Sequence, residues 1–191
     1  MRSILIVIAF VFSFEASAQS FLNHSYSQIE RQTGFPFTKK IYSEDLDNDN
    51  LTDFIILSNE IKIYKNIGGN NFEVKRLNKS DIGYDTYNDL VFLDYNNDGL
   101  KDLIIASYTV LFFKNNGDFN FELDTAIALE TTAFHTFHSL ALLDINKDGE
   151  KEIIVSGSFR ELYSMSKKSD GYFEAPIKLG TFSLFRENIK N

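Results

Sequence analysis

The sequence predicts an all-β protein built from three consecutive four-stranded antiparallel units of about 50 residues each. Three observations support this prediction: an acidic loop motif that recurs at a fixed period, short apolar segments on both sides of each loop, and Asn/Gly-rich turns further along each unit. A fixed period of this length is typical of repeat architectures, in which neighbouring units bury each other's apolar faces.

The acidic motif D-x-[DN]-x-D-[GN]-x-x-[DE] occurs three times without gaps, at residues 45–53, 94–102 and 144–152, so that the copies start 49 and 50 residues apart. Each copy lies between two short apolar segments, as in Leu90–Leu93 before the second copy and Leu103–Ala106 after it. Because these segments are short and rich in β-branched and aromatic residues, they predict strands that are buried on both faces. Each acidic loop therefore connects two strands.

Two further strands per unit are visible downstream, most clearly at 110–114 and 119–123 around the turn Asn115-Asn116-Gly117-Asp118. The first unit repeats the arrangement with segments 61–65 and 72–77 around another Asn/Gly turn. Asn and Gly tolerate the positive φ angles that tight hairpins require.

Four strands per 50 residues correspond to one blade of a β-propeller, and propellers usually close with four to eight blades. The three acidic loops therefore predict a partial propeller: an open array, a ring completed by a partner, or a piece of a longer chain. Exposed edge blades would favour self-association. The expected organisation is a signal peptide 1–18, an N-terminal segment 19–37, blades at about 38–84, 85–134 and 135–180, and a C-terminal segment 181–191.

The N-terminus has the layout of a cleaved secretory signal, with Arg2, an apolar run over residues 4–14 and the small-residue segment Ala16-Ser17-Ala18 before Gln19. The apolar run is much shorter than the roughly 20 residues that a membrane-spanning helix needs. We therefore expect a secreted product, periplasmic or extracellular, with no membrane insertion after signal cleavage.

The composition narrows the classes of partner and of cross-link. The formal net charge of −8 argues against nucleic acid and anionic membrane as ligands. The chain contains no cysteine, so that packing or metal rather than disulfides must hold the folded chain together.

The loops have the donor pattern of a Ca²⁺ site, since Ca²⁺ takes six to eight oxygen ligands from a flexible loop. Positions 1, 3, 5 and 9 of the loop carry side-chain oxygens, and position 7 offers a backbone carbonyl. Position 6 must adopt a left-handed backbone conformation, and the residues there are Asn50, Gly99 and Gly149, the types that suit this conformation best. An EF-hand would need a glutamate at position 12, where all three loops have an aliphatic residue. About three Ca²⁺ ions per chain are expected, and the predicted ligands are Asp45, Asp47, Asp49, Leu51 and Asp53; Asp94, Asn96, Asp98, Leu100 and Asp102; and Asp144, Asn146, Asp148, Glu150 and Glu152.

The alternative is that these are ordinary polar hairpin connections whose acids are solvated. Three copies in register argue against it, because clustered carboxylates repel one another unless a cation lies between them. A bound metal would therefore act as a structural staple.

With these residues in view, the chain resembles the FG-GAP/VCBS repeats of the integrin α-subunit propeller and of many secreted bacterial proteins, over roughly residues 38–180. The segments Tyr64-Lys65-Asn66 and Phe113-Lys114-Asn115 also look like the family. The resemblance implies a Ca²⁺-stabilised propeller used for adhesion or ligand display, or appended to an enzyme. Asn50 in place of Gly and Glu152 in place of Asp depart from the family pattern.

No nucleophile or phosphate-binding motif is present, and His135 and His138 lack a third nearby His or Cys that would make them a metal site. We therefore predict a secreted, non-catalytic calcium-binding repeat protein for adhesion or recognition of a protein or glycan. The alternatives are a secreted polysaccharide-active enzyme, or a fragment of one, and a structural piece of a larger surface assembly. Among the aromatic residues, Tyr84, Tyr87 and Tyr108 are the better candidates for exposed contact with a ligand, and the favoured alternative is a core role or random exposure.

Overall fold

The computed structural model describes residues 40–58, 60–77, 87–129 and 135–181, all of which belong to one compact unit, Lys39–Asn191. The predicted signal peptide, the N-terminal segment 19–37 and Tyr84 lie outside the described residues, as does the C-terminal segment 181–191 apart from Thr181. Within the described part of the chain, no helix is long and apolar enough to cross a membrane.

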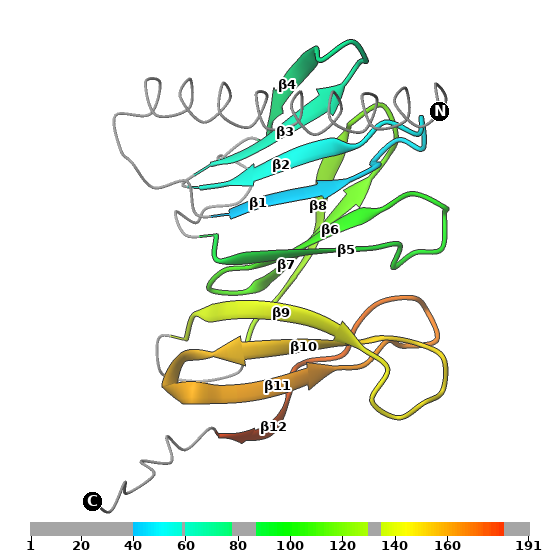
Figure 1. Cartoon of the computed structure of the whole chain (residues 1–191). Helices are drawn as coiled ribbons and strands as arrows, with labels where there is room; N and C mark the ends of the chain where they lie inside the picture. Colours follow the sequence, from blue (N-terminus) through cyan, green and yellow to red (C-terminus); the bar gives the residue numbers. More distant parts are fainter. Residues whose placement is uncertain (1–39, 59, 78–86, 130–134, 182–191) are drawn as a thin grey trace, which may run out of the picture. The chain divides into compact units, whose positions relative to one another are not determined.

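The described residues form three four-stranded antiparallel sheets in which each strand pairs with the next one along the chain (Figure 1). This confirms the predicted all-β fold of three four-stranded units. The first sheet contains β1 (Lys40–Glu44), β2 (Asp53–Leu57), β3 (Ile61–Asn66) and β4 (Phe72–Arg76). The second contains β5 (Asp89–Leu93), β6 (Asp102–Ala106), β7 (Val110–Asn115) and β8 (Phe121–Ile127), and the third contains β9 (Phe137–Leu143), β10 (Glu152–Gly157), β11 (Glu161–Met165) and β12 (Ile177–Thr181).

One predicted strand, 119–123, starts later than its sequence pattern indicates. β8 begins at Phe121, because Asp118 and Phe119 have positive φ angles of 47° and 55° and complete the turn after β7. Phe119 is apolar and buried, like the residues of the neighbouring strands, because its ring lies in the core between the first two sheets. The apolar pattern therefore extended the predicted strand into the turn.

Among the described residues, two apolar clusters form the core, one between the first and second sheets and one between the second and third. β6 contributes to both, because successive side chains of a strand point to opposite faces. Leu103 and Ile105 belong to the first cluster, and Ile104 and Ala106 to the second, all with no solvent exposure. The inner strands β6 and β7 of the second sheet are therefore buried on both faces, as predicted for Leu103–Ala106. The same prediction was wrong for Leu90–Leu93, because all of its residues after Leu90 are only half-buried.

A single carboxylate connects the three sheets. Asp89, the first residue of β5, accepts hydrogen bonds at Oδ1 from the Lys40 ammonium, at 2.7 Å, and from the Tyr42 hydroxyl of β1. Its Oδ2 accepts the backbone N–H of Leu140 in β9 at 2.9 Å. Burial opposes ionisation of this side chain, but the three donors outweigh burial and hold the pKa of Asp89 below its ordinary value.

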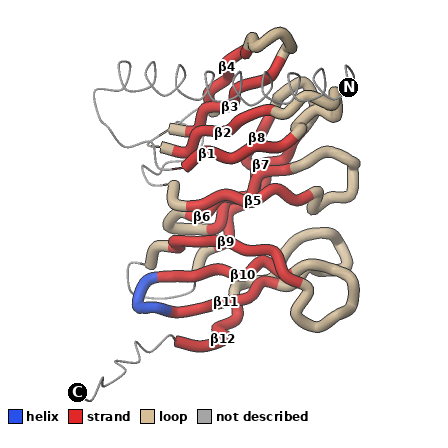
Figure 2. Tube along the Cα trace, in the orientation of Figure 1, coloured by secondary structure: helices blue, strands red, loops and turns tan. Residues whose placement is uncertain are grey.

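The acidic loops occupy equivalent places in the three sheets, since they connect β1 to β2, β5 to β6 and β9 to β10. Figure 2 shows these connections in tan, at the opposite end of the sheets from the hairpins that join β2 to β3, β6 to β7 and β10 to β11. The first two loops touch, because the Asn48 side-chain amide donates to the Gly99 carbonyl at 3.2 Å.

Candidate metal centres in the acidic loops

The first residue of each acidic loop closes the loop by accepting two backbone N–H groups. In the first loop, Asp45 accepts from the backbone of Asp49 at 3.2 Å and of Asn50 at 2.9 Å. The Asp49 carboxylate in turn accepts the N–H of Leu51 at 2.8 Å. The second loop repeats these bonds: Asp94 accepts the backbone N–H groups of Asp98 and Gly99, and Asp98 accepts that of Leu100. The third loop repeats them as well: Asp144 accepts the backbone N–H groups of Asp148 and Gly149, and Asp148 accepts that of Glu150.

The backbone follows the predicted left-handed conformation at position 6 of every loop. The φ angles there are 66° at Asn50, 89° at Gly99 and 94° at Gly149. Position 4 is left-handed as well, with φ angles close to 60°, which the sequence analysis missed although two of the three residues are asparagines. These residues are Asn48, Asn97 and Lys147.

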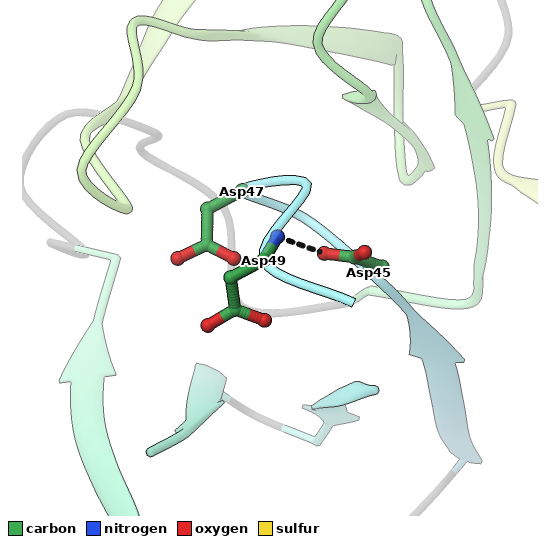
Figure 3. A group of neighbouring side chains, drawn as sticks. All are labelled: Asp45, Asp47 and Asp49. Carbon is green, nitrogen blue, oxygen red and sulfur yellow. Dashed lines mark hydrogen bonds between the residues drawn. The ribbon is translucent and has the colours of Figure 1, made fainter. Parts of the chain in front are cut away.

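In the first loop these bends bring three carboxylates together. Asp45, Asp47 and Asp49 each offer an oxygen within 4.8 Å of the other two (Figure 3). The Oδ1 atom of Asp47 is buried and has no hydrogen-bond partner. A buried carboxylate oxygen without a donor is costly unless a cation or donor approaches it, and an all-oxygen donor set is the one that Ca²⁺ prefers. The first loop can therefore hold a metal ion, and the residues present fit Ca²⁺.

Position 3 differs in the second and third loops, where it is an asparagine. The side-chain oxygens of Asn96 and Asn146 accept the backbone N–H groups of Asp98 and Asp148, both at 2.9 Å. An amide oxygen remains a possible Ca²⁺ ligand, since carbonyl oxygens of Asn coordinate this ion. The prediction that these two loops bind metal stays a prediction.

The acid at position 9 is buried and accepts hydrogen bonds that connect the loop to its sheet. Asp53 and Asp102 have no solvent exposure. One oxygen of Asp53 accepts the N–H of Leu46 at 2.9 Å, and the other accepts the N–H of Asn66, at the end of β3, at 2.9 Å. Asp102 bonds in the same way to the N–H groups of Tyr95 and Asn115. In the third loop, Glu152 accepts from the N–H of Ile145 and from the side-chain amide of Asn146.

These buried acids are held at an electrostatic cost. Burial raises the pKa of Asp102 to about 6, against the lowering effect of its two backbone donors, and the charges of Asp98 and Asp94 raise it further. Burial also raises the pKa of Asp53, with the same opposition from its two donors. A nearby cation would relieve both, so the role of position 9 as a ligand stays a prediction that the electrostatics favour.

Position 7 was expected to offer its carbonyl to the ion. The backbone N–H groups of Leu51, Leu100 and Glu150 point into their loops and donate to the acid at position 5. The Glu150 side chain instead lies outside, 3.8 Å from the Lys167 ammonium. Coordination by these three carbonyls stays a prediction.

Two lysines from the third strand of a sheet reach the loop carboxylates, a role that the sequence analysis did not assign. Lys65 Nζ lies 2.6 Å from Asp47 Oδ2, and Lys114 Nζ lies 3.7 Å from Asp98 Oδ2. The third sheet has Ser166 at the equivalent place, directly after Met165, which pairs with Ile153. The signal in the sequence was the shared Lys-Asn pair that ends β3 and β7.

The asparagine of that pair fastens the loop to its sheet. Asn66 donates its side-chain amide to the Thr52 carbonyl at 3.1 Å. Asn115 donates to the Lys101 carbonyl at 3.0 Å and also to the carbonyl of Leu46, in the first loop, at 2.8 Å. Asn115 therefore connects the second sheet to the first acidic loop.

The opposite end of the sheets carries a different group of side chains. Phe159, in the turn η2 (Ser158–Arg160) between β10 and β11, has a φ angle of 60° and is 68% exposed. The ring of His135 packs edge-on against it, with centroids 5.4 Å apart, and His135 Nδ1 lies 3.8 Å from Glu161. His138 is exposed, and no group of potential metal ligands among the described residues contains either histidine.

Of the three tyrosines named as candidates for ligand contact, Tyr87 is buried, in agreement with the alternative of a core role. Tyr87 is 1% exposed and belongs to the first apolar cluster, because it lies just before β5 where the first two sheets pack. Tyr108 is exposed in the hairpin between β6 and β7.

Comparison with known proteins finds a matching repeat family and similarity to a solved lectin. A family model described as FG-GAP-like repeat matches residues 45–105 and 94–155, so that each match contains two successive acidic loops. No curated protein matches the sequence. A solved lectin from Agrocybe aegerita, described as specifically recognising non-reducing terminal N-acetylglucosamine, is similar with a TM-score of 0.50 and 19% identity, over 77% of this chain and 40% of that one. At this identity the similarity shows the fold, and the chain spans about two fifths of that lectin's length.

Proposed function

This chain belongs to the FG-GAP-like repeat family, and on that premise we propose that it is a secreted, non-catalytic calcium-binding repeat protein that recognises a glycan. The observation that carries the calcium part is the grouping of the Asp45, Asp47 and Asp49 carboxylates, together with the buried Asp47 Oδ1 that has no hydrogen-bond partner. In the second and third loops, the first aspartate accepts the same backbone N–H groups as in the first loop, and this shared geometry supports one ion in each loop, about three per chain.

The proposed ions are structural. Each loop joins the first two strands of its sheet, and its carboxylates are held close together by backbone N–H groups of the same loop. A bound Ca²⁺ would supply the positive charge that offsets their repulsion. The loop residues orient the ligand oxygens through these hydrogen bonds, and the left-handed position 6 turns the chain around the ion.

Glycan recognition is supported by the propeller-type fold, which the chain shares with the Agrocybe aegerita lectin. The exposed Phe159 gives the chain an aromatic face of the kind that can pack against the apolar side of a sugar ring. Its left-handed φ angle is an additional reason to connect it with binding. Such a conformation costs a non-glycine residue about 1–2 kcal/mol and persists at functional sites.

The calcium part is tested by calorimetric titration of Ca²⁺ into the secreted chain after it has been stripped with a chelator. We expect about three sites per chain, with dissociation constants of roughly 10⁻⁴–10⁻³ M or tighter, as in extracellular calcium modules. A folded chain that takes up no calcium would contradict the proposal and reduce the loops to polar connections.

The glycan part is tested by binding to a glycan array that includes terminal N-acetylglucosamine, with Ca²⁺ and with EDTA. Binding that is weakened by EDTA is expected, because the loops shape the sheets that present the ligand site. Turnover of a polysaccharide would favour the enzyme alternative, and calcium-dependent self-association without glycan binding would favour a structural assembly.

A further inference from the structure

We propose that Lys65 is a built-in counter-ion of the first acidic loop, which competes with Ca²⁺ for Asp47 and thereby sets the calcium affinity of that loop below the value its four carboxylates would give. This inference rests on the proposed binding of calcium by the loops. It goes further in assigning to one lysine of the chain the control of occupancy at one of the three sites.

The lysine bonds to a carboxylate that the metal needs. Lys65 Nζ lies 2.6 Å from Asp47 Oδ2, and the Asp47 side chain is 13% exposed. Asp47 occupies position 3 of the loop, and its second oxygen, Oδ1, is buried without a hydrogen-bond partner. An ion bound between Asp45, Asp47 and Asp49 would therefore meet a carboxylate that is already neutralised by a neighbouring ammonium.

The ammonium is held in place from its other side. Lys65 Nζ lies 4.9 Å from the centre of the Phe119 ring, which belongs to the turn between β7 and β8 of the second sheet. Phe119 is 4% exposed and is fixed in the core between the two sheets. A cation between a carboxylate and an aromatic face is attracted by both, so Lys65 is positioned before any metal arrives.

The three repeats provide a graded comparison. The equivalent lysine of the second sheet, Lys114, lies farther from its loop, 3.7 Å from Asp98 Oδ2, and its side chain is 41% exposed. An exposed pair at this distance contributes little, because water and salt screen it. The third sheet has Ser166 at this place, and the ammonium described beside its loop, that of Lys167, lies near Glu150 at position 7.

The competition predicts opposite effects on the two states of the protein. Without metal, Lys65 offsets part of the repulsion among Asp45, Asp47, Asp49 and Asp53, so its removal should destabilise the metal-free chain. With metal, the ammonium and the divalent ion repel each other, so its removal should tighten binding. By linkage, the increase in melting temperature that calcium produces should then be larger in the variant.

The test compares Lys65→Met with Lys114→Met, using calorimetric titration of Ca²⁺ and thermal unfolding in EDTA. Methionine keeps an unbranched apolar stem beside Phe119 while the charge is removed. In Lys65→Met we expect one of the sites to bind calcium about tenfold more tightly, the size of effect that close charge pairs show. Its melting temperature in EDTA should fall. Lys114→Met should stay within about twofold of the wild type, and Lys65→Arg, which keeps the charge, should also bind like the wild type.

Unchanged or weaker calcium binding by a folded Lys65→Met variant, with normal binding by the wild type, would overturn the role of Lys65 alone. An equal tightening in Lys114→Met would also overturn it, since the effect would then be general electrostatics. Absence of calcium binding by the wild type would instead contradict the proposed function, and this inference with it.

Discussion

Substitution of Asp89 is the perturbation whose cost can be worked out most directly from the fold. Asp89→Ala removes the acceptor of three hydrogen bonds that join the first and third sheets to β5. The Lys40 side chain is 42% exposed and can turn to water, so its share is small. Tyr42 and the Leu140 N–H are less accessible, and each loses a bond to a charged acceptor worth about 1.5–3 kcal/mol.

The expected loss of unfolding free energy is therefore about 3–5 kcal/mol. For a domain of this size, that corresponds to a fall of about 10 °C in melting temperature. The assay is equilibrium urea unfolding at pH 7 in EDTA, with Glu174→Ala, an exposed acid of the third sheet's final connection, as control. If Asp89→Ala cost less than about 1 kcal/mol, or no more than the control, the view that this carboxylate holds the sheets together would be refuted.

The same residue predicts a dependence on pH. Because its donors hold the pKa of Asp89 below the value in the unfolded chain, its contribution is complete above the unfolded value near 3.9 and is lost as the pH falls through the lower folded value. The stability difference between the wild type and Asp89→Ala should therefore be constant from about pH 7 to 5 and shrink below about pH 4. A difference that grew on acidification would contradict this sign.

Three further predictions concern the loops and the opposite end of the sheets. Gly99→Ala should cost about 1 kcal/mol in urea unfolding, since a Cβ there meets no atom within 4 Å and the cost is that of the left-handed φ angle of 89° alone. Asp98→Ala should lower the melting temperature in millimolar Ca²⁺ and change it little in EDTA, whereas an equal loss in both would mean that the loop does not use metal. Phe159→Asn should raise the melting temperature by a few degrees, because asparagine tolerates the left-handed conformation. The same substitution should lower glycan binding on the array, and unchanged binding would show that Phe159 does not belong to the ligand site.

The repeat made most of the fold predictable. Apolar segments such as Leu103–Ala106 have no polar positions, and this pattern correctly indicated strands covered on both faces. The left-handed residues at position 6 were predictable as well, because Gly99, Gly149 and Asn50 belong to the small set of residues that adopt this conformation at low cost. These features depend on local sequence, which a period of about 50 residues repeats three times.

What the sequence could not provide is the set of partners that lie outside a residue's own strand. Asp89 looks like a polar residue at the start of a strand, and its partners Tyr42 and Leu140 are 47 and 51 residues away. Asp53 looks like one more calcium ligand, but one of its oxygens accepts the N–H of Asn66, which lies on the neighbouring strand β3. Lys65 belongs to a short family-like segment, and its contact with Phe119 exists only when the first two sheets pack.

The double burial of β6 has a consequence for how the molecule unfolds. Leu103 and Ile105 support one cluster and Ile104 the other, so that the second sheet cannot open without exposing both. Each of the other two sheets contributes to one of the clusters that the described residues form. In a repeat array whose stability is a sum of nearest-neighbour interfaces, fraying therefore starts at the outer sheets. Amide protons of β6 and β7 should exchange with solvent last, through global unfolding, and those of β4 and β12 first, through local opening.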